Sequence, residues 1–166
     1  MEKKKKKIKK LKDELDSYMF QTIGHNLIEA ISECFELPLV QHFFEGKSTQ
    51  RELGYNPEKI NTEDEVEDLY QLLKKVKENF PEITGVSCGT ILSDYQRNRV
   101  ENVCSRLNLI SLTYLWQKDQ TELLNEMVEN EMNAILVKTA SMGLFPNKHL
   151  GKSLKELQNT FEKLVN

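Results

Sequence analysis

The chain has 166 residues, of which 39% are hydrophobic and 30% are charged, so it is long enough for one globular domain with a substantial core. Its formal net charge of -3 argues against nucleic acid as the main partner. No apolar run is long enough to cross a membrane and the start lacks the apolar segment of a secretory signal, so we expect no membrane partner.

Residues 1–12 form a lysine-rich stretch of low complexity. Like charges repel and little of this stretch can be buried, so we expect a disordered or frayed tail. A nuclear-targeting or nucleic-acid-binding patch is the less favoured alternative. The rest of the chain, residues 13–166, is expected to form the domain.

Helices and strands alternate along this domain. Helices are predicted where apolar residues recur at helical spacing, and strands where short apolar runs meet turn residues. The predicted elements are a helix over 17–35, a strand over 39–44, a helix from Thr62 to Phe80, a strand over 86–92, a helix from Ser93 to Asn108, a strand over 110–115, a helix from Asp119 to Val128, a strand over 134–139 and a helix over 150–164. This order predicts an α/β fold with a mostly parallel sheet and helices on both faces.

The junction at Ser93 is the candidate binding site. The predicted strand over 86–92 turns directly into a helix there, and Gln96 stands three residues later in the pattern of a capping box. A helix amino terminus at the carboxyl edge of a parallel sheet attracts anions, and Arg97 and Arg99 are close by. A purely structural role, as a helix cap and a solvated face, is the alternative reading.

Other patterns of catalysis are missing from the sequence. Gly46 and Gly151 each open a Gly-Lys-Ser triplet, but neither has the preceding glycine of a Walker motif. The histidines and the three cysteines show no metal-ligand spacing, and we expect buried, reduced thiols in a cytoplasmic protein. Polar residues do follow each predicted strand, which favours a nucleotide or small-substrate site but does not indicate the reaction.

The stretch from Gly85 to Glu101, GVSCGTILSDYQRNRVE, resembles the signature of diphthine–ammonia ligase, also called diphthamide synthase. Shorter matches stand in the same order before and after it, at 14–25, 63–70, 112–117 and 138–152. The resemblance covers almost everything from Asp13 to about Leu157.

This resemblance implies an ATP-dependent enzyme of the ATP-pyrophosphatase superfamily, with a Rossmann-like, adenine nucleotide α-hydrolase-like fold. Such an enzyme amidates diphthine, a modified histidine of translation elongation factor 2, with ammonium. The implied route is attack of the diphthine carboxylate on the α-phosphate of ATP, followed by displacement of AMP from the acyl-adenylate by ammonia. The implied cofactors are ATP and Mg²⁺, and the implied partners are elongation factor 2 and ammonium.

The resemblance also implies which residues lie in the nucleotide and substrate cleft. They are Ser93, Asp94, Tyr95, Gln96, Arg97, Arg99, Glu101, Lys138, Gly143, Lys152, Ser17, Tyr18 and Met19. The arginines are implied contacts for phosphate or carboxylate, the lysines are weaker candidates for the same region, and residues 17–19 border the adenine. No catalytic residue and no metal ligand is assigned.

The sequence departs from the family pattern at both ends. Family members begin with a strand that ends in a Ser-Gly-Gly-Lys-Asp-Ser phosphate loop, where this chain has its lysine run, and the later Gly-Glu-Gly-Gly-Glu-type motif is also absent. We therefore expect residues 13–166 to be a partial ligase domain, incomplete at the amino terminus, in a truncated form with little activity alone. The alternative is a non-catalytic nucleotide- or protein-binding module derived from the family.

Overall fold

The computed structural model describes residues 17–21 and 23–165, and the predicted lysine-rich tail over 1–12 lies outside them. The elements are η1 (His25–Leu27), α1 (Ile28–Phe35), η2 (Pro57–Lys59), α2 (Glu65–Asn79), β1 (Gly85–Ser87), α3 (Asp94–Arg106), β2 (Ile110–Leu112), α4 (Gln120–Glu129), α5 (Pro146–His149) and α6 (Leu154–Val165). The protein is therefore a mixed α/β structure, as the alternation of elements predicted.

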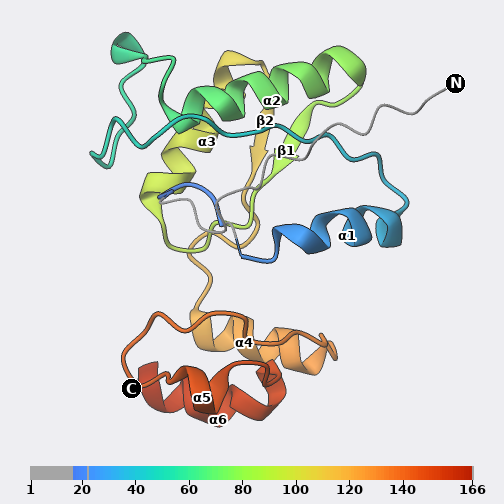
Figure 1. Ribbon diagram of the computed structural model, residues 1–166, viewed down its shortest axis with the longest axis vertical. Coiled ribbons are helices and arrows are strands. Elements are labelled where there is room, and N and C mark those ends of the chain that lie inside the picture. The colour runs from blue at the N-terminus through green and yellow to red at the C-terminus, as the bar shows by residue number, and fades with distance from the viewer. Residues whose placement is uncertain (1–16, 22, 166) are drawn as a thin grey trace, which may run out of the picture.

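The sheet is parallel and consists of β1 and β2, with Gly85 opposite Ile110 and Ser87 opposite Leu112. Helix α3 connects the two strands, so β1, α3 and β2 form a crossover unit, which parallel strands require. Helix α3 packs against β2 and also against α2 (Figure 1). Gly85 suits this pairing, because a Cβ there would lie 3.3 Å from the carbonyl oxygen of Ile110.

Two of the four predicted strands do not form. Residues 39–44 are irregular, with the side chains of Leu39 and Phe43 exposed, because no neighbouring strand pairs with them among the described residues. Residues 134–139 do not join the sheet either. Leu136 donates its backbone N–H to the carbonyl of Lys152, and Ile135 forms a single antiparallel bridge with Ser153. This segment pairs with the chain that leads into α6.

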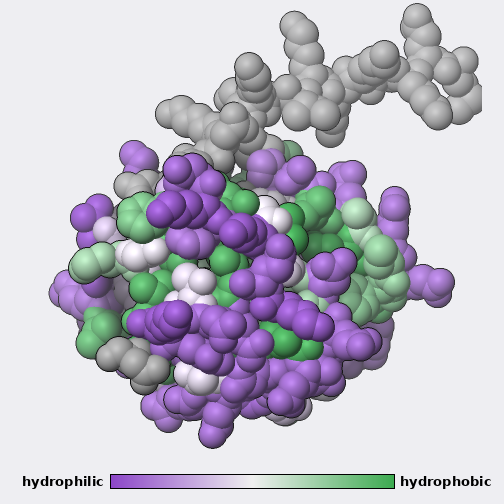
Figure 2. All heavy atoms as spheres, turned by 90° about the horizontal axis from the view of Figure 1, so that it is seen from below, coloured by the Kyte–Doolittle hydropathy of each residue, from purple (hydrophilic) through white to green (hydrophobic). Residues whose placement is uncertain are grey.

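The first predicted helix is also shorter than expected. Gly24, with a φ of 83°, precedes the one-turn helix η1, and regular helix begins only at Ile28. Helix α1 buries none of its residues, so the prediction of a buried Cys34 thiol is wrong. Its apolar side chains, among them Ile31 and Phe35, stay exposed. Figure 2 shows green, apolar surface on the side of the molecule where Figure 1 places α1.

The buried side chains form two groups. The larger one lies between α2, α3 and the sheet and includes Val66, Leu73 and Val103. Leu123 of α4 and Leu157 of α6 are buried outside that cluster, where these two helices pack together. In Figure 1, α4, α5 and α6 form a layer of their own below the sheet. The described helices are all too short or too polar to cross a lipid bilayer.

Candidate functional site

At the junction between β1 and α3, the predicted helix start is confirmed, with Ser93 as its cap. Ser93 is extended and accepts the backbone N–H of Gln96 at 3.3 Å, and α3 begins at the exposed residue Asp94. The strand is shorter than predicted, because β1 ends at Ser87 and only Cys88 continues the pairing, through its N–H to the carbonyl of Leu112. A cap of this kind leaves the positive end of the helix dipole facing the turn.

The segment at Ser17 meets this junction from far away in the sequence. The side-chain amide of Gln96 donates to the carbonyls of Tyr18 and Met19, both at 3.3 Å, and the rings of Tyr18 and Tyr95 lie 5.8 Å apart. Ser17 fixes the turn, because its hydroxyl accepts the N–H of Met19 and donates to the Glu65 carboxylate at 2.6 Å. Five predicted site residues, Ser17, Tyr18, Met19, Tyr95 and Gln96, therefore lie together.

Arg97 joins the ends of the two strands. Its guanidinium lies over the ring of Trp116, 4.7 Å from the centroid, and its Nε donates to Glu101 at 2.7 Å. The N–H of Gln117 donates to the carbonyl of Ile91 at 2.9 Å, which ties the turn after β2 to the turn after β1. Polar residues that follow the two formed strands thus meet at one edge of the sheet.

Arg99 lies inside the protein. It is fully buried, and its guanidinium donates to the carbonyls of Gln50, Glu52 and Leu53, with the shortest distance of 2.7 Å to Gln50. Its charge also lies 3.3 Å from the centroid of the Tyr95 ring. Burial raises the pKa of the Tyr95 hydroxyl, which donates to the same Gln50 carbonyl. Arg99 therefore positions a loop and a tyrosine.

Acidic residues at the start of α2 accept backbone N–H groups from residues 46–50, which lead into the loop that Arg99 contacts. The sequence analysis did not predict this role. Helix α2 begins at Glu65 rather than at the predicted Thr62, and Asp64 is its cap. The Asp64 carboxylate also accepts the backbone N–H groups of Thr49 and Gln50. Asp68 accepts the N–H of Gly46 at 2.8 Å. The signal was present as a run of acids at a helix start, which reads equally well as a simple cap or a solvated face.

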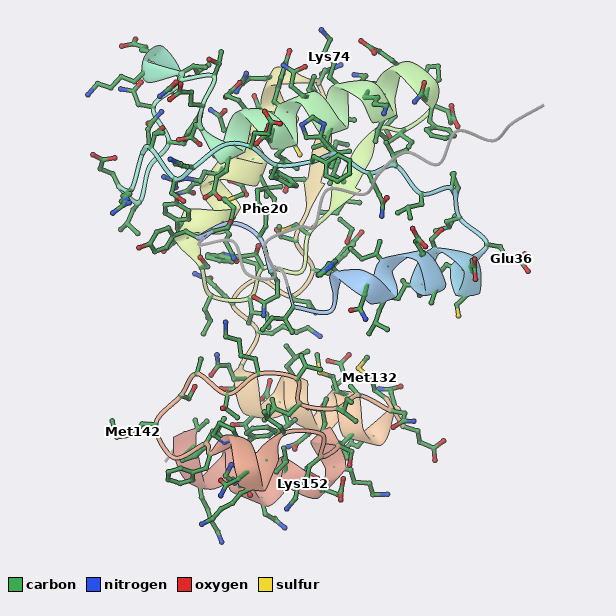
Figure 3. All side chains as sticks on the ribbon, in the orientation of Figure 1. Phe20, Glu36, Lys74, Met132, Met142 and Lys152 are labelled. Atoms are coloured by element: carbon green, nitrogen blue, oxygen red, sulfur yellow. The ribbon has the colours of Figure 1, made fainter. Side chains whose placement is uncertain are left out.

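Lys138, Gly143 and Lys152 belong to the layer of α4, α5 and α6. Gly143 has a φ of 88°, and a Cβ there would collide with the side chain of Leu164 in α6. Lys152 and Phe20, both labelled in Figure 3, lie in different layers of the molecule. Gly143 thus lies against α6, and Lys152 lies in a different layer from the segment that meets the junction at Ser93.

A cavity of about 310 Å³ lies between the segment at Met19, helix α2, the end of β1 and helix α3. Leu69, Leu73 and Val100 supply apolar walls, while Thr90 and Gln96 supply polar groups. Apolar walls with a few polar groups are typical of small-ligand sites. Within residues 17–21 and 23–165, no three His, Cys, Asp or Glu side chains come together as a metal ion would require.

Sequence comparisons show which known proteins the chain is similar to. Residues 3–111 match the family model of the diphthamide synthase N-terminal domain. The chain is similar to the diphthine–ammonia ligase of Danio rerio, with 56% identity over 146 residues, which are 88% of this chain and 56% of that protein. The Homo sapiens enzyme is 51% identical over 146 residues, 88% of this chain and 53% of that protein, and the Schizosaccharomyces pombe enzyme is 53% identical over 148 residues, 89% of this chain and 24% of that protein.

The chain thus spans about half the length of the two animal relatives and about a quarter of the yeast one. The family match covers residues on both sides of the junction at Ser93, including every residue that meets there from the segment at Ser17 and from α3. This chain belongs to the diphthamide synthase N-terminal domain family.

Proposed function

We propose that this chain provides part of an ATP-dependent ligase that converts diphthine to diphthamide on translation elongation factor 2, with ammonium as the nitrogen source. The relatives named diphthine–ammonia ligase support the reaction class. The observation that carries the proposal is the meeting of the segment at Ser17 with the amino terminus of α3 beside the cavity of about 310 Å³. The same proposal places the protein in the cytoplasm, where translation occurs.

Two features at the junction would attract the phosphates of ATP. The amino terminus of α3 presents the positive end of its dipole, and Arg97, about a third exposed, lies within one turn of it. On this proposal Mg²⁺ would neutralise the phosphates of the nucleotide. Asp94 is an exposed carboxylate directly after the cap at Ser93, and we propose that it faces that ion.

On this proposal the diphthine carboxylate is activated as an acyl-adenylate, and ammonia then displaces AMP. The chain's own residues bind and orient the reactants. Gln96 fixes the segment at Tyr18 against α3, and Trp116 holds the Arg97 guanidinium at the sheet edge. We place Arg99 behind the site, as the residue that fixes Tyr95.

Titration calorimetry with ATP tests the nucleotide site. We expect Arg97→Ala and Asp94→Ala each to weaken binding of ATP with Mg²⁺ about tenfold, while the melting temperature stays nearly unchanged. The first removes a cation that would face the phosphates, and the second removes a carboxylate that would face Mg²⁺. Lys118→Ala, in the exposed pair with Glu126 before α4, is the matched control and should change neither quantity. A large loss of melting temperature with unchanged ATP binding would give Asp94 and Arg97 a structural role instead.

Mass spectrometry of diphthine-bearing elongation factor 2, incubated with the chain, ATP and ammonium, tests the reaction. We expect the chain to bind ATP and the diphthine-bearing factor, with little amidation by this portion alone. Binding of the factor without any binding of nucleotide would instead support the non-catalytic protein-binding module. If neither is bound, the proposed function is wrong.

A further inference from the structure

We propose that helix α1 and the residues at its two ends form a surface through which two copies of this chain associate. This surface, the α1 face, consists of five large apolar side chains that are 41% to 70% exposed, namely Leu27, Ile28, Ile31, Phe35 and Leu37. None of them lines the cavity beside the junction at Ser93, so the inference does not depend on the proposed function.

Helix α1 is too short to be stable by itself. It has eight residues, from Ile28 to Phe35, whereas an isolated helix is marginal in water below about 12 to 15 residues. Helices in proteins take most of their stability from the packing of an apolar face. Because α1 buries no residue in its own protomer, that packing comes from outside it.

The apolar side chains of α1 form one stripe. Ile28, Ile31 and Phe35 are separated by three and four positions, a spacing that places them on the same side of the helix. Glu29 and Glu33 are four positions apart, are exposed and share another side. Two copies therefore meet along the stripe without bringing these acids into the contact.

Leu37 extends the stripe beyond the end of the helix. Glu36, with a φ of 53°, is in the left-handed conformation and turns the chain. The N–H of Leu37 donates to the carbonyl of Ser32 at 3.1 Å, and the Ser32 hydroxyl donates to the carbonyl of Leu37 at 2.8 Å. These bonds form a Schellman motif, in which the residues at the positions of Leu37 and Ile31 commonly pack together. Leu37 thus adds its side chain to the α1 face.

The area of the α1 face matches the apolar part of a homodimer interface. At about 200 Å² for each large apolar side chain, the exposed fractions leave on the order of 500 Å² of apolar surface. A standard interface buries about 800 Å² per partner, and about two-thirds of a homodimer interface is apolar, which again gives on the order of 500 Å². A second copy supplies an equal stripe through a two-fold axis, and an antiparallel pair of α1 helices also aligns their dipoles favourably.

Sedimentation equilibrium of the full chain, from about 1 µM to about 200 µM, tests the inference. We expect a monomer–dimer equilibrium with a dissociation constant of about 10 µM, at the weak end for an interface of this size. Ile31→Asp should raise the dissociation constant about hundredfold or more, because the two-fold axis places the new carboxylate in the interface twice. A chain that stays monomeric throughout this range, or a dimer that Ile31→Asp does not weaken, would overturn the inference.

Two further variants control for charge and for loss of the helix. Met142→Asp adds the same charge at a residue that is 95% exposed in the layer of α4, α5 and α6, and it should leave the dissociation constant unchanged. Ile31→Ala favours the helix, since alanine has the highest helix propensity, yet it should still raise the dissociation constant about tenfold through the lost apolar area. Equal effects of Met142→Asp and Ile31→Asp, or no effect of Ile31→Ala, would contradict the role of the α1 face.

Cys34 reports where the two copies meet. Its thiol is exposed on α1, next to Phe35 in the sequence, so a short bismaleimide should link two copies through it. Cys34→Ser should abolish the covalent link while sedimentation still shows the dimer. A covalent dimer that forms equally well in Cys34→Ser means that the copies meet elsewhere, and the inference is then wrong.

Discussion

Arg99 is the residue on which the geometry of the site depends most. It is a fully buried charge whose partners are main-chain carbonyls of the loop at 50–53 and the ring of Tyr95. Its substitution would leave several part-buried carbonyls without this donor. We expect Arg99→Met to lower the free energy of unfolding by about 3 kcal/mol, measured by urea denaturation. Arg51→Met, at an exposed arginine of the same loop, should change it by less than about 0.5 kcal/mol, and equal stability of the two variants would contradict this role.

Tyr55 makes the stability of the protein sensitive to alkaline pH. Burial, and then its hydrogen bond to Glu67 at 3.0 Å, raises the pKa of its hydroxyl well above the ordinary value of 10.0. In the unfolded chain Tyr55 ionises near pH 10, while in the folded protein it stays neutral. Its contribution is therefore complete below pH 10 and is lost as pH rises toward the folded pKa, at up to about 1.4 kcal/mol per pH unit.

Urea denaturation of the wild type and Tyr55→Phe at pH 9 and pH 11 tests this. Phenylalanine lacks the hydroxyl and so cannot form the bond to Glu67, and the variant should therefore be less stable than the wild type at pH 9. Its free energy of unfolding should then fall less steeply than that of the wild type between pH 9 and pH 11. Parallel falls in the two proteins would show that Tyr55 does not cause the alkaline loss.

At the scale of elements, the cap of α2 also binds a distant loop, whereas the cap of α4 binds only its own helix. The Asp64 carboxylate caps α2 through the N–H of Val66 and also accepts N–H groups of Thr49 and Gln50, and it is 1% exposed. Asp119 caps α4 in solvent, through the N–H groups of Thr121 and Glu122. We expect Asp64→Ala to cost about 3 kcal/mol and Asp119→Ala about 1 kcal/mol, measured by thermal or urea unfolding. Equal costs would show that the loop at Thr49 does not depend on Asp64.

At the scale of the whole molecule, local signals predicted more than long-range ones did. The caps of α3 at Ser93 and of α4 at Asp119 followed from the sequence, because they depend on residues two or three positions apart. The strands predicted at 39–44 and 134–139 failed, because a strand requires a partner that periodicity cannot identify. The hydrogen bonds from Arg99 to the carbonyls of the loop could not be predicted from local sequence patterns either, since they join residues 46 to 49 positions apart.

The two groups of buried side chains give the last prediction. Leu157 is 2% exposed in α6, where it belongs to the packing of α6 with α4, while Val103 is fully buried in the cluster between α2, α3 and the sheet. Leu157→Ala should cost about 3 kcal/mol, and Val103→Ala should cost about 2 kcal/mol. Leu123 and Leu157 do not belong to the cluster that contains Val103. Each substitution should therefore lower the local stability of one layer more than that of the other. Hydrogen exchange followed residue by residue should then show faster exchange mainly in α4 and α6 for Leu157→Ala, and mainly in α2 and α3 for Val103→Ala. The same rise in exchange throughout the described chain for both variants would mean that the two layers unfold as one cooperative unit.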